Sequence, residues 1–229
     1  MNYDGKTIRN KSFIKRFSHS KRYFLSSELI AKFKPLKILD YGAGDGELYK
    51  FINKSQKKNY YFYEPNISMV KELKFNLKKY KINKIFSNPQ KIYQNYFDLI
   101  CINEVFEHLN INEQKKIFKY LKKISVKNCN FVISVPIEVG LSSLLKNLIR
   151  IFTFQTHENT TFKNILKSFF YVNIKRSTKK YSNSHIGFNY INFINFLKKE
   201  NLKILNVYYS PFNSLRGLIN SQIFIVAKF

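Results

Sequence analysis

Three glycines occupy alternate positions in one short run, Leu39-Asp40-Tyr41-Gly42-Ala43-Gly44-Asp45-Gly46. The run follows apolar residues 36–39, which are typical of a buried strand, and a helix-like segment begins directly after it at Glu47. Glycine is needed where a backbone must approach a ligand closely or adopt positive φ. A strand, a glycine loop and a helix in this order predict a cradle for a nucleotide-like ligand. Glu47 stands where a dinucleotide fingerprint has its third glycine, which argues against a nicotinamide cofactor.

A carboxylate follows the next strand-like segment. Glu64 ends the aromatic residues 59–63, comes 22 residues after Gly42 and precedes Pro65 and Asn66. A carboxylate at such a strand end can accept hydrogen bonds from both hydroxyls of a ribose. The alternative is that Glu64 only caps the helix that follows.

Two further carboxylates and an imidazole lie close together beyond the apolar residues 97–102. If the chain turns helical after Asn103, the offsets of three and four residues place Glu104, Glu107 and His108 on one face. Such a set could bind a divalent ion, and the histidines that could complete it, His157 and His185, lie far along the chain. We predict packing roles and no metal, and keep Glu104, Glu107 and His108 as the alternative metal set.

Strand-like and helix-like segments alternate along most of the chain, which predicts an α/β fold with a mostly parallel sheet and helices on both faces. The predicted strands are 36–39, 59–63, 84–86, 97–102, 130–135, 202–209 and 222–228, and the predicted helices among them are 18–33, 47–53, 67–79, 112–124 and 190–200. After Pro136 the alternation lapses, and two helices, 141–154 and 162–170, precede a polar loop at 173–184.

The composition bounds the class of protein. The 229 residues suit one α/β domain with an insertion, and 45% hydrophobic and 17% aromatic residues exclude a disordered chain. No apolar run reaches transmembrane length and the polar start is no secretory signal, so a cytoplasmic location is expected. Cys101 and Cys129 are expected to be reduced core thiols.

The net charge of +26 has two interpretations. It would suit a nucleic acid, an anionic membrane surface or an acidic substrate. Lysine supplies most of the charge, however, while arginine, the better residue for bidentate phosphate recognition, is scarce. Abundant lysine, asparagine, isoleucine and aromatic residues are also what A/T-rich codons produce, and we favour this interpretation over selection for binding nucleic acid.

In order and spacing, the motifs resemble those of the class I S-adenosylmethionine (SAM) dependent methyltransferases, in the small-molecule branch with type 11/12-like domains. The glycine run resembles the first motif, and Glu64 the second. The segment Phe97 to Leu109 resembles a fourth motif that reads Phe-Asp, an apolar strand and Glu-His-Leu, and Ser134-Val135-Pro136 resembles the turn after the fifth strand. The likeness spans 36–136 and, more loosely, 185–229.

The resemblance implies a Rossmann-like, seven-stranded, mostly parallel sheet whose last strand is antiparallel. It divides the single domain into an N-terminal helical cap (1–34), a SAM-binding half (35–136), a helical lid or insertion (137–189) and a C-terminal helix with two strands (190–229). It also implies SAM as the methyl donor and S-adenosylhomocysteine as the product.

The same resemblance implies the contacts to the cofactor. Asp40 would face the ammonium group, the glycine loop the carboxylate and Glu64 the ribose. Asn88, after the short third strand, stands where relatives often have an aspartate that holds the adenine. The predicted cofactor residues are Asp40, Tyr41, Gly42, Ala43, Gly44, Gly46, Glu64, Pro65, Asn66, Asn88, Asn103 and Glu104.

The candidate catalytic residues are His185 and His108. His185 begins a His-Ile-Gly-Phe segment that resembling enzymes often carry near the mouth of the active site, where it could be a general base for a hydroxyl or a hinge residue. The Asn-Pro-Pro-Tyr loop of amide and nucleobase N-methyltransferases is absent, because Asn103-Glu104-Val105-Phe106 stands in its place.

We therefore predict methyl transfer to a hydroxyl of a small molecule, such as a sugar, a quinone or a surface-polysaccharide intermediate. The helix at 141–154, with Lys146 and Arg150, would suit a lipid-linked or anionic acceptor at a membrane face, or it packs as a lid. The alternatives are a metal-dependent RNA 2′-O-methyltransferase, whose relatives share the Glu-x-x-Glu-His order, and a non-catalytic binding or scaffold subunit with the SAM-methyltransferase fold. The oligomeric state is not predicted.

Overall fold

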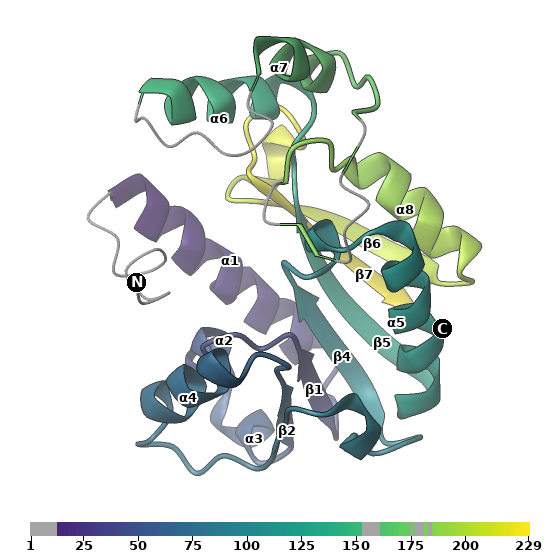
Figure 1. Cartoon of the computed structure of the whole chain (residues 1–229). Coiled ribbons are helices and arrows are strands. Elements are labelled where there is room, and N and C mark those ends of the chain that lie inside the picture. Colours follow the sequence, from purple (N-terminus) through teal and green to yellow (C-terminus); the bar gives the residue numbers. More distant parts are fainter. Residues whose placement is uncertain (1–12, 153–160, 175, 177–180, 183–184) are drawn as a thin grey trace.

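The computed structural model describes residues 13–152, 161–174, 176, 181–182 and 185–229. In this part of the chain seven strands form one sheet with the order β3-β2-β1-β4-β5-β7-β6 (Figure 1). The strands are β1 (Ile38–Tyr41), β2 (Tyr60–Tyr63), β3 (Ile85–Phe86), β4 (Phe97–Asn103), β5 (Ser125–Pro136), β6 (Lys203–Ser210) and β7 (Gln222–Lys228). Strands β1 to β5 are parallel, and β7 is antiparallel to both β5 and β6. The predicted sheet is confirmed.

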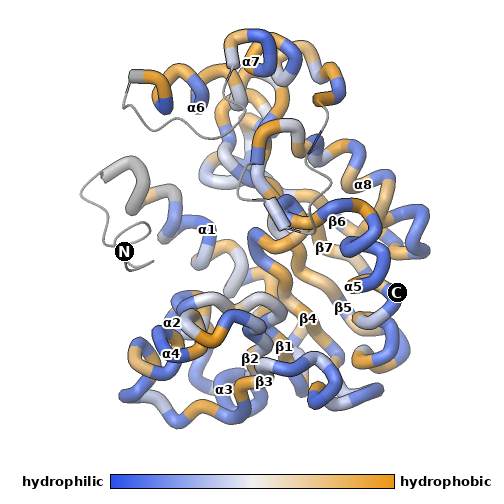
Figure 2. The backbone as a smooth tube through the Cα atoms, in the orientation of Figure 1, coloured by the Kyte–Doolittle hydropathy of each residue, from blue (hydrophilic) through white to orange (hydrophobic). Residues whose placement is uncertain are grey.

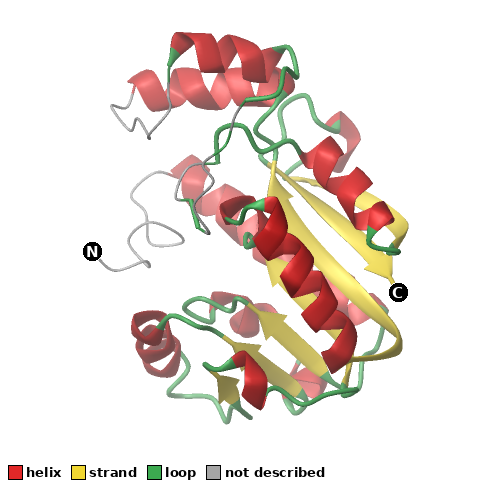
Figure 3. Ribbon diagram, turned by 45° about the vertical axis from the view of Figure 1, so that its right-hand side comes forward, coloured by secondary structure: helices red, strands yellow, loops and turns green. Residues whose placement is uncertain are grey.

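Helices cover both faces of the sheet (Figure 3). Side chains of α5 (Ile111–Ile124) and α8 (Tyr190–Lys199) form the core on one face. Side chains of α1 (Phe13–Lys32), α2 (Glu47–Phe51) and α4 (Ile67–Asn76) form it on the other, and the short α3 (Lys54–Lys57) lies between α2 and β2. The strands are apolar on both sides because both sides are covered.

Strand β4 shows how this pattern arises. Its side chains alternate between the faces, so Leu99 and Cys101 pack toward α1 and α2, while Ile100 and Ile102 pack toward α5. All four are fully buried. A continuous apolar run is therefore what this central strand requires.

Asparagine side chains define where the longer helices begin. Asn66 accepts a hydrogen bond from the Ser68 N–H at the start of α4, and Asn110 accepts one from the Glu113 N–H at the start of α5. Asn189 does the same for the Ile191 N–H at the start of α8. These N-caps satisfy backbone donors that lack partners within the helix.

The element bounds differ from the prediction in one informative place. Strand β5 begins at Ser125, five residues earlier than predicted, because Ser125 pairs with Phe97 of β4. The added residues include the exposed Lys127 and Asn128, which carry no apolar signal. Strand pairing extends the element where hydropathy alone could not.

Two helices, α6 (Gly140–Phe152) and α7 (Phe162–Phe169), follow β5 and lie side by side at the end of the molecule beyond the sheet (Figures 1 and 3). Lys146 and Arg150 are the two basic residues of α6, and they would suit an anionic acceptor at a membrane face only if they faced outward. Both side chains turn inward to Glu138, with Lys146 Nζ 3.1 Å from Glu138 Oε1 and Arg150 Nη1 3.3 Å from Glu138 Oε2. Among the described helices, none is both long and apolar enough to cross a membrane.

The chain reverses its direction of travel across the sheet at β1. From β1 it continues outward to β2 and β3, and it then returns to build β4 and β5 on the other side of β1. Ligands of open α/β sheets bind at the carboxyl ends of the strands, where such a reversal leaves a crevice. The loops after β1, β2 and β4 are therefore the place to look for a functional site.

Candidate active site at the carboxyl ends of the strands

The loop after β1 is shaped by its glycines. Gly42, Gly44 and Gly46 have φ values of 82°, 55° and 78°. A Cβ atom on Gly42 would lie 2.5 Å from Val105 Cγ2, in the turn after β4. Gly42 therefore allows both the positive φ and the close approach of two loops that border the crevice.

The N–H groups of this loop donate within the protein. Gly42 and Ala43 donate to the Tyr63 carbonyl at 2.8 and 3.0 Å, and Gly46 donates to the Ala43 carbonyl at 3.0 Å. The Gly44 N–H donates to Glu64 Oε2 at 2.8 Å. The loop thus presents a Cβ-free surface, and these four N–H groups donate within the protein.

Glu64 holds this loop against the loop after β2. Its second oxygen, Oε1, accepts from the Asn66 N–H at 2.8 Å, and the residue is 7% exposed. Burial raises the pKa of the carboxyl, while the two N–H donors oppose the shift. Each oxygen has one protein donor, and a carboxylate oxygen has room for two. Pro65 and Asn66 beside it are exposed.

Asp40 lies beneath the glycine loop, on the side of α1 and α2. It is 2% exposed, and its Oδ2 accepts from the Tyr60 hydroxyl at 2.8 Å. Burial raises the pKa of Asp40 to about 6, although hydrogen bonds from Tyr60 and Cys101 oppose the shift. Tyr41 points to the opposite face, where its ring packs 4.6 Å from that of Tyr63.

The remaining predicted cofactor residues lie at the ends of β3 and β4. Asn88 is exposed, and its Oδ1 accepts from the Gln90 N–H at 2.9 Å, which caps a short 3-10 turn at Pro89–Lys91. Asn103 is half-buried, and its Oδ1 accepts from the Ser134 hydroxyl at 2.9 Å. Its Nδ2 donates to the Ser26 hydroxyl at 3.3 Å. No sequence signal marks Ser26 or Ser134 as partners of Asn103, because they lie on α1 and β5.

Glu104 leaves the strand in a left-handed turn rather than a helix. Its φ is 53°, and only the three residues Phe106–His108 that follow form a short 3-10 turn. Its carboxylate pairs with Arg22 of α1. Burial would raise the pKa of Glu104, but Arg22 and nearby imidazoles outweigh it and lower the pKa. The prediction that Glu104, Glu107 and His108 share one face of a helix is therefore wrong.

His185, and not Glu104, lies with Glu107 and His108 in the structure. One ligand atom from each of Glu107, His108 and His185 lies within 4.8 Å of the others. Glu107 is 0% exposed, and neither of its carboxylate oxygens has a hydrogen-bond partner. The two imidazole rings meet edge to face at 4.7 Å. The other distant histidine, His157, lies outside the described residues.

Both imidazoles are neutral near pH 7. Burial lowers the pKa of His108, and it lowers that of His185 to about 4. His108 Nδ1 lies 2.8 Å from the Ser182 carbonyl oxygen, which can only accept, so Nδ1 carries the proton and Nε2 keeps its lone pair. Burial and the charge of Glu104 raise the pKa of Glu107 well above its usual range.

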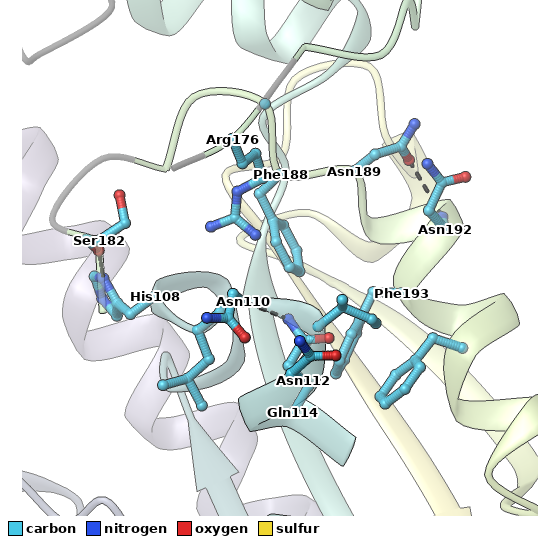
Figure 4. A pocket seen from close by; sticks show the side chains of 14 residues that line it. His108, Asn110, Asn112, Gln114, Arg176, Ser182, Phe188, Asn189, Asn192 and Phe193 are labelled. Carbon is cyan, nitrogen blue, oxygen red and sulfur yellow. Dashed lines mark hydrogen bonds between the residues drawn. The ribbon is translucent and has the colours of Figure 1, made fainter. Parts of the chain in front are cut away.

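A cavity of about 420 Å³ opens beside His108, between the start of α5 and the segment leading into α8 (Figure 4). Its polar lining includes amides and one guanidinium, from Asn110, Asn112, Asn189, Asn192 and Arg176. Arg176 also lies over the Phe188 ring and donates to the Glu107 carbonyl. The cavity lining includes no residue of the glycine loop. Arg176 has no signal in the sequence.

The site residues fit the cofactor that the sequence implies. A loop that a Cβ would obstruct adjoins a buried carboxylate with capacity for further donors, and both lie at the switch point of the sheet. This combination accommodates the sugar of a nucleoside lying close to the backbone.

Comparisons with known proteins agree with this geometry. The profile of a family described as Methyltransferase domain matches residues 12–170. The chain is similar in structure to the PH0226 protein of Pyrococcus horikoshii OT3, with 14% identity and a TM-score of 0.63 over 99% of this chain and 96% of that one. No curated protein matches the chain.

Two further solved structures have the same fold. Magnesium protoporphyrin IX methyltransferase of Synechocystis PCC 6803, with bound S-adenosylhomocysteine, is 11% identical with a TM-score of 0.57 over 95% of this chain and 87% of that one. The methyltransferase domain of bacterial CtHen1 is 14% identical with a TM-score of 0.58 over 90% and 96%. The family match covers most of the chain, so the protein belongs to the Methyltransferase domain family and is a SAM-dependent methyltransferase.

Proposed function

We propose that this methyltransferase acts on a hydroxyl oxygen of a small-molecule acceptor, such as a sugar, a quinone or a surface-polysaccharide intermediate. The observation that supports this most directly is the pair of neutral imidazoles, His108 and His185, just beyond the end of β4. A hydroxyl keeps its proton until it attacks, so its methylation benefits from a positioned base. His185 would accept that proton, and His108 is the second candidate for this role.

When bound, SAM supplies a methyl group activated by its sulfonium. The chain's own contribution is to hold and orient the reactants in a site with little water. Glu64 would accept from the ribose hydroxyls with the lone pairs that Gly44 and Asn66 leave open. We further propose that Asp40 acts from beneath the loop, by holding it through Tyr60, rather than by contact with the ammonium group. Asn88 and its exposed surroundings would border the adenine.

The acceptor would approach through the cavity beside His108. Its amides and the Arg176 guanidinium suit an acceptor that carries several oxygen atoms. Residues 137–189, whose described parts supply Arg176, Ser182 and His185 to this region, would form the lid over it. The wall that Phe188 and Phe193 add suits a ring or an apolar portion of the same molecule.

The test is transfer of labelled methyl from SAM to a panel of sugars, quinones and lipid-linked sugars. We expect label on oxygen, and the variants His185→Ala and His108→Ala should each reduce turnover while leaving S-adenosylhomocysteine affinity nearly unchanged. Failure to bind SAM or S-adenosylhomocysteine, together with no transfer to any acceptor, would instead support a non-catalytic subunit with this fold. Transfer to nitrogen alone would contradict the proposal.

A second candidate, methylation of a ribose hydroxyl of RNA with the help of a divalent cation, rests on one observation. The buried, unpartnered Glu107 carboxylate adjoins two imidazoles that can each present a lone pair. Carboxylate and imidazole are a donor set that Zn²⁺, Mn²⁺ and related ions accept. Glu107, His108 and His185 would hold the cation. In this set His185 replaces Glu104, which the sequence spacing had grouped with Glu107 and His108.

Chelation separates the two candidates. Activity on RNA that is lost with EDTA and restored by Mn²⁺ would favour the second, whereas undiminished activity on a small hydroxyl acceptor in EDTA would favour the first. Direct metal analysis of the dialysed protein gives a readout that does not depend on having the right acceptor.

A further inference from the structure

Helix α6 is amphipathic, but its orientation in the fold is inverted. Its polar residues Ser142, Ser143 and Asn147 are 2%, 1% and 1% exposed. Its apolar residues face outward, with exposures of 40% to 59% for Leu141, Leu145, Leu148, Ile149 and Ile151. Figure 2 shows that α6, which lies at the end of the molecule beyond the sheet, contains both hydrophobic and hydrophilic segments.

A network of ion pairs and hydrogen bonds fixes this orientation. Glu138 is 1% exposed and pairs with both Lys146 and Arg150. Burial by itself would raise the pKa of Glu138, but the two cations lower it to about 2. Lys146 Nζ also donates to the Ile137 and Ser221 carbonyls at 2.6 and 3.0 Å, and Ser142 donates to the Asn220 carbonyl.

The helix could not rotate to bury its leucines without leaving Glu138 buried and unpaired, because Lys146 and Arg150 would turn away from it. Removing the partners of a buried charge is strongly destabilising. The apolar stripe is therefore a stable feature of the surface.

Segments next to α6 also carry exposed apolar side chains. On α7, Phe162, Leu166 and Phe170 follow at helical spacing and are 77%, 39% and 66% exposed, while Ile165 and Ser168 are buried. Leu218 and Ile219 precede Asn220, the partner of Ser142, and are 58% and 46% exposed. We refer to these exposed residues of α6, α7 and 218–219 together as the α6–α7 face. Monomeric proteins rarely expose contiguous apolar patches of this kind without a partner.

The positive charge of the segments around the α6–α7 face favours an anionic surface over a second copy of the chain as its partner. After Glu138 the sequence contains only two acidic residues, Glu158 and Glu200, against thirteen lysines and arginines. Lys163 and Arg216 are exposed in the segments that form the face. In a symmetric dimer the same surface meets itself, so these cations would face their own copies with few acids to pair with them. An anionic surface carries the complementary charge.

We propose that the α6–α7 face docks on an anionic lipid bilayer, with the leucines of α6 and the phenylalanines of α7 among the acyl chains and Lys163 and Arg216 at the headgroups. Helices that lie in a membrane interface combine such an apolar stripe with flanking cations. The two cations of α6, Lys146 and Arg150, face the interior and pair with Glu138, and these pairs keep the apolar side of the helix outward. The proposal does not depend on the reaction or on the acceptor.

Co-sedimentation of the full chain with vesicles tests the proposal. We expect binding to vesicles of phosphatidylcholine with phosphatidylglycerol, weaker binding to phosphatidylcholine alone, and weaker binding at high salt. The double variant Leu145→Asp/Leu148→Asp should weaken partitioning by about tenfold or more, because two apolar side chains no longer insert. The control Ile67→Asp/Phe75→Asp, on α4, carries the same change of charge at residues that are 70% and 67% exposed.

Folding is checked by the melting temperature and by S-adenosylhomocysteine affinity, and Leu145→Gln/Leu148→Gln replaces the aspartate variant if that one fails. Wild-type protein that does not bind anionic vesicles would overturn the proposal. Equal weakening in both aspartate pairs would overturn it as well, since charge alone would then explain binding. A dimer that the Leu145/Leu148 variants dissociate, without vesicle binding, would assign the face to self-association.

Discussion

Glu64 Oε2 accepts a hydrogen bond of 2.8 Å from the Gly44 N–H, and Oε1 accepts one of 2.8 Å from the Asn66 N–H. One side chain therefore joins the loop after β1 to the loop after β2, at the point where the chain reverses across the sheet. A carboxylate in this position sets the spacing of the cradle and keeps lone pairs for a ligand.

We expect Glu64→Gln to weaken binding of S-adenosylhomocysteine by about ten- to a hundredfold. The glutamine amide is uncharged and has one acceptor oxygen, whereas the carboxylate is charged and has two. Titration calorimetry measures this directly. Glu28→Gln, at an exposed position on α1, is the matched control. Equal affinity of the parent and Glu64→Gln would remove Glu64 from the cofactor site.

Gly42→Ala should destabilise the protein by about 2–4 kcal/mol, since it adds a Cβ at positive φ and within 2.5 Å of Val105 Cγ2. Urea denaturation measures the change. Adding Val105→Ala should recover only the steric part, because the strain at positive φ remains. Gly44→Ala, with Met69 Cε 3.7 Å away, isolates that strain. Full recovery in the double variant would show that φ is not limiting.

Asp40 should make stability depend on pH. Its pKa is raised from 3.8 to about 6, so the folded state holds a proton that the unfolded state has released. Stability therefore falls as pH rises from 3.8 to about 6, and the loss is complete above that range. Asp40→Asn keeps an acceptor for Tyr60 without the charge, and should be about 1–3 kcal/mol more stable than the parent at pH 7.5 but not at pH 4. A constant difference across this range would contradict the assignment.

Glu107→Gln tests the cation at the Glu107, His108 and His185 cluster. Co²⁺ bound through two imidazoles and a carboxylate should give visible absorption in the parent, and the variant should bind Co²⁺ at least about tenfold more weakly. Glu113→Gln, on α5 and paired with Lys116, leaves the cluster intact and should behave as the parent does. Absence of Co²⁺ binding by the parent would leave the imidazoles as bases without a metal.

Much of the candidate cofactor site could be predicted from the sequence, because the motifs that mark it are local. The alternation of strands and helices, the glycine run after β1 and the position of Glu64 each depend on a few consecutive residues and on rules of backbone geometry. The seven strands and the antiparallel last strand followed from the family resemblance, whereas the order of the strands came from the structure. Asp40 was recognised as part of the motif, but its partner Tyr60 could be identified only once β1 and β2 were paired in register.

The tertiary structure alone decided the rest. His185 reaches Glu107 and His108 across a long segment, and the positive φ of Glu104 breaks the helical spacing that the sequence suggests. The buried Glu138 holds Lys146 and Arg150 inward, so hydropathy alone could not show which side of α6 faces outward. Local sequence thus determined the loops that we propose hold the methyl donor. Which side chains meet beside these loops, and which face stays exposed, was determined by contacts between residues far apart in the sequence. The pattern of apolar and polar residues along the chain does not reveal such contacts.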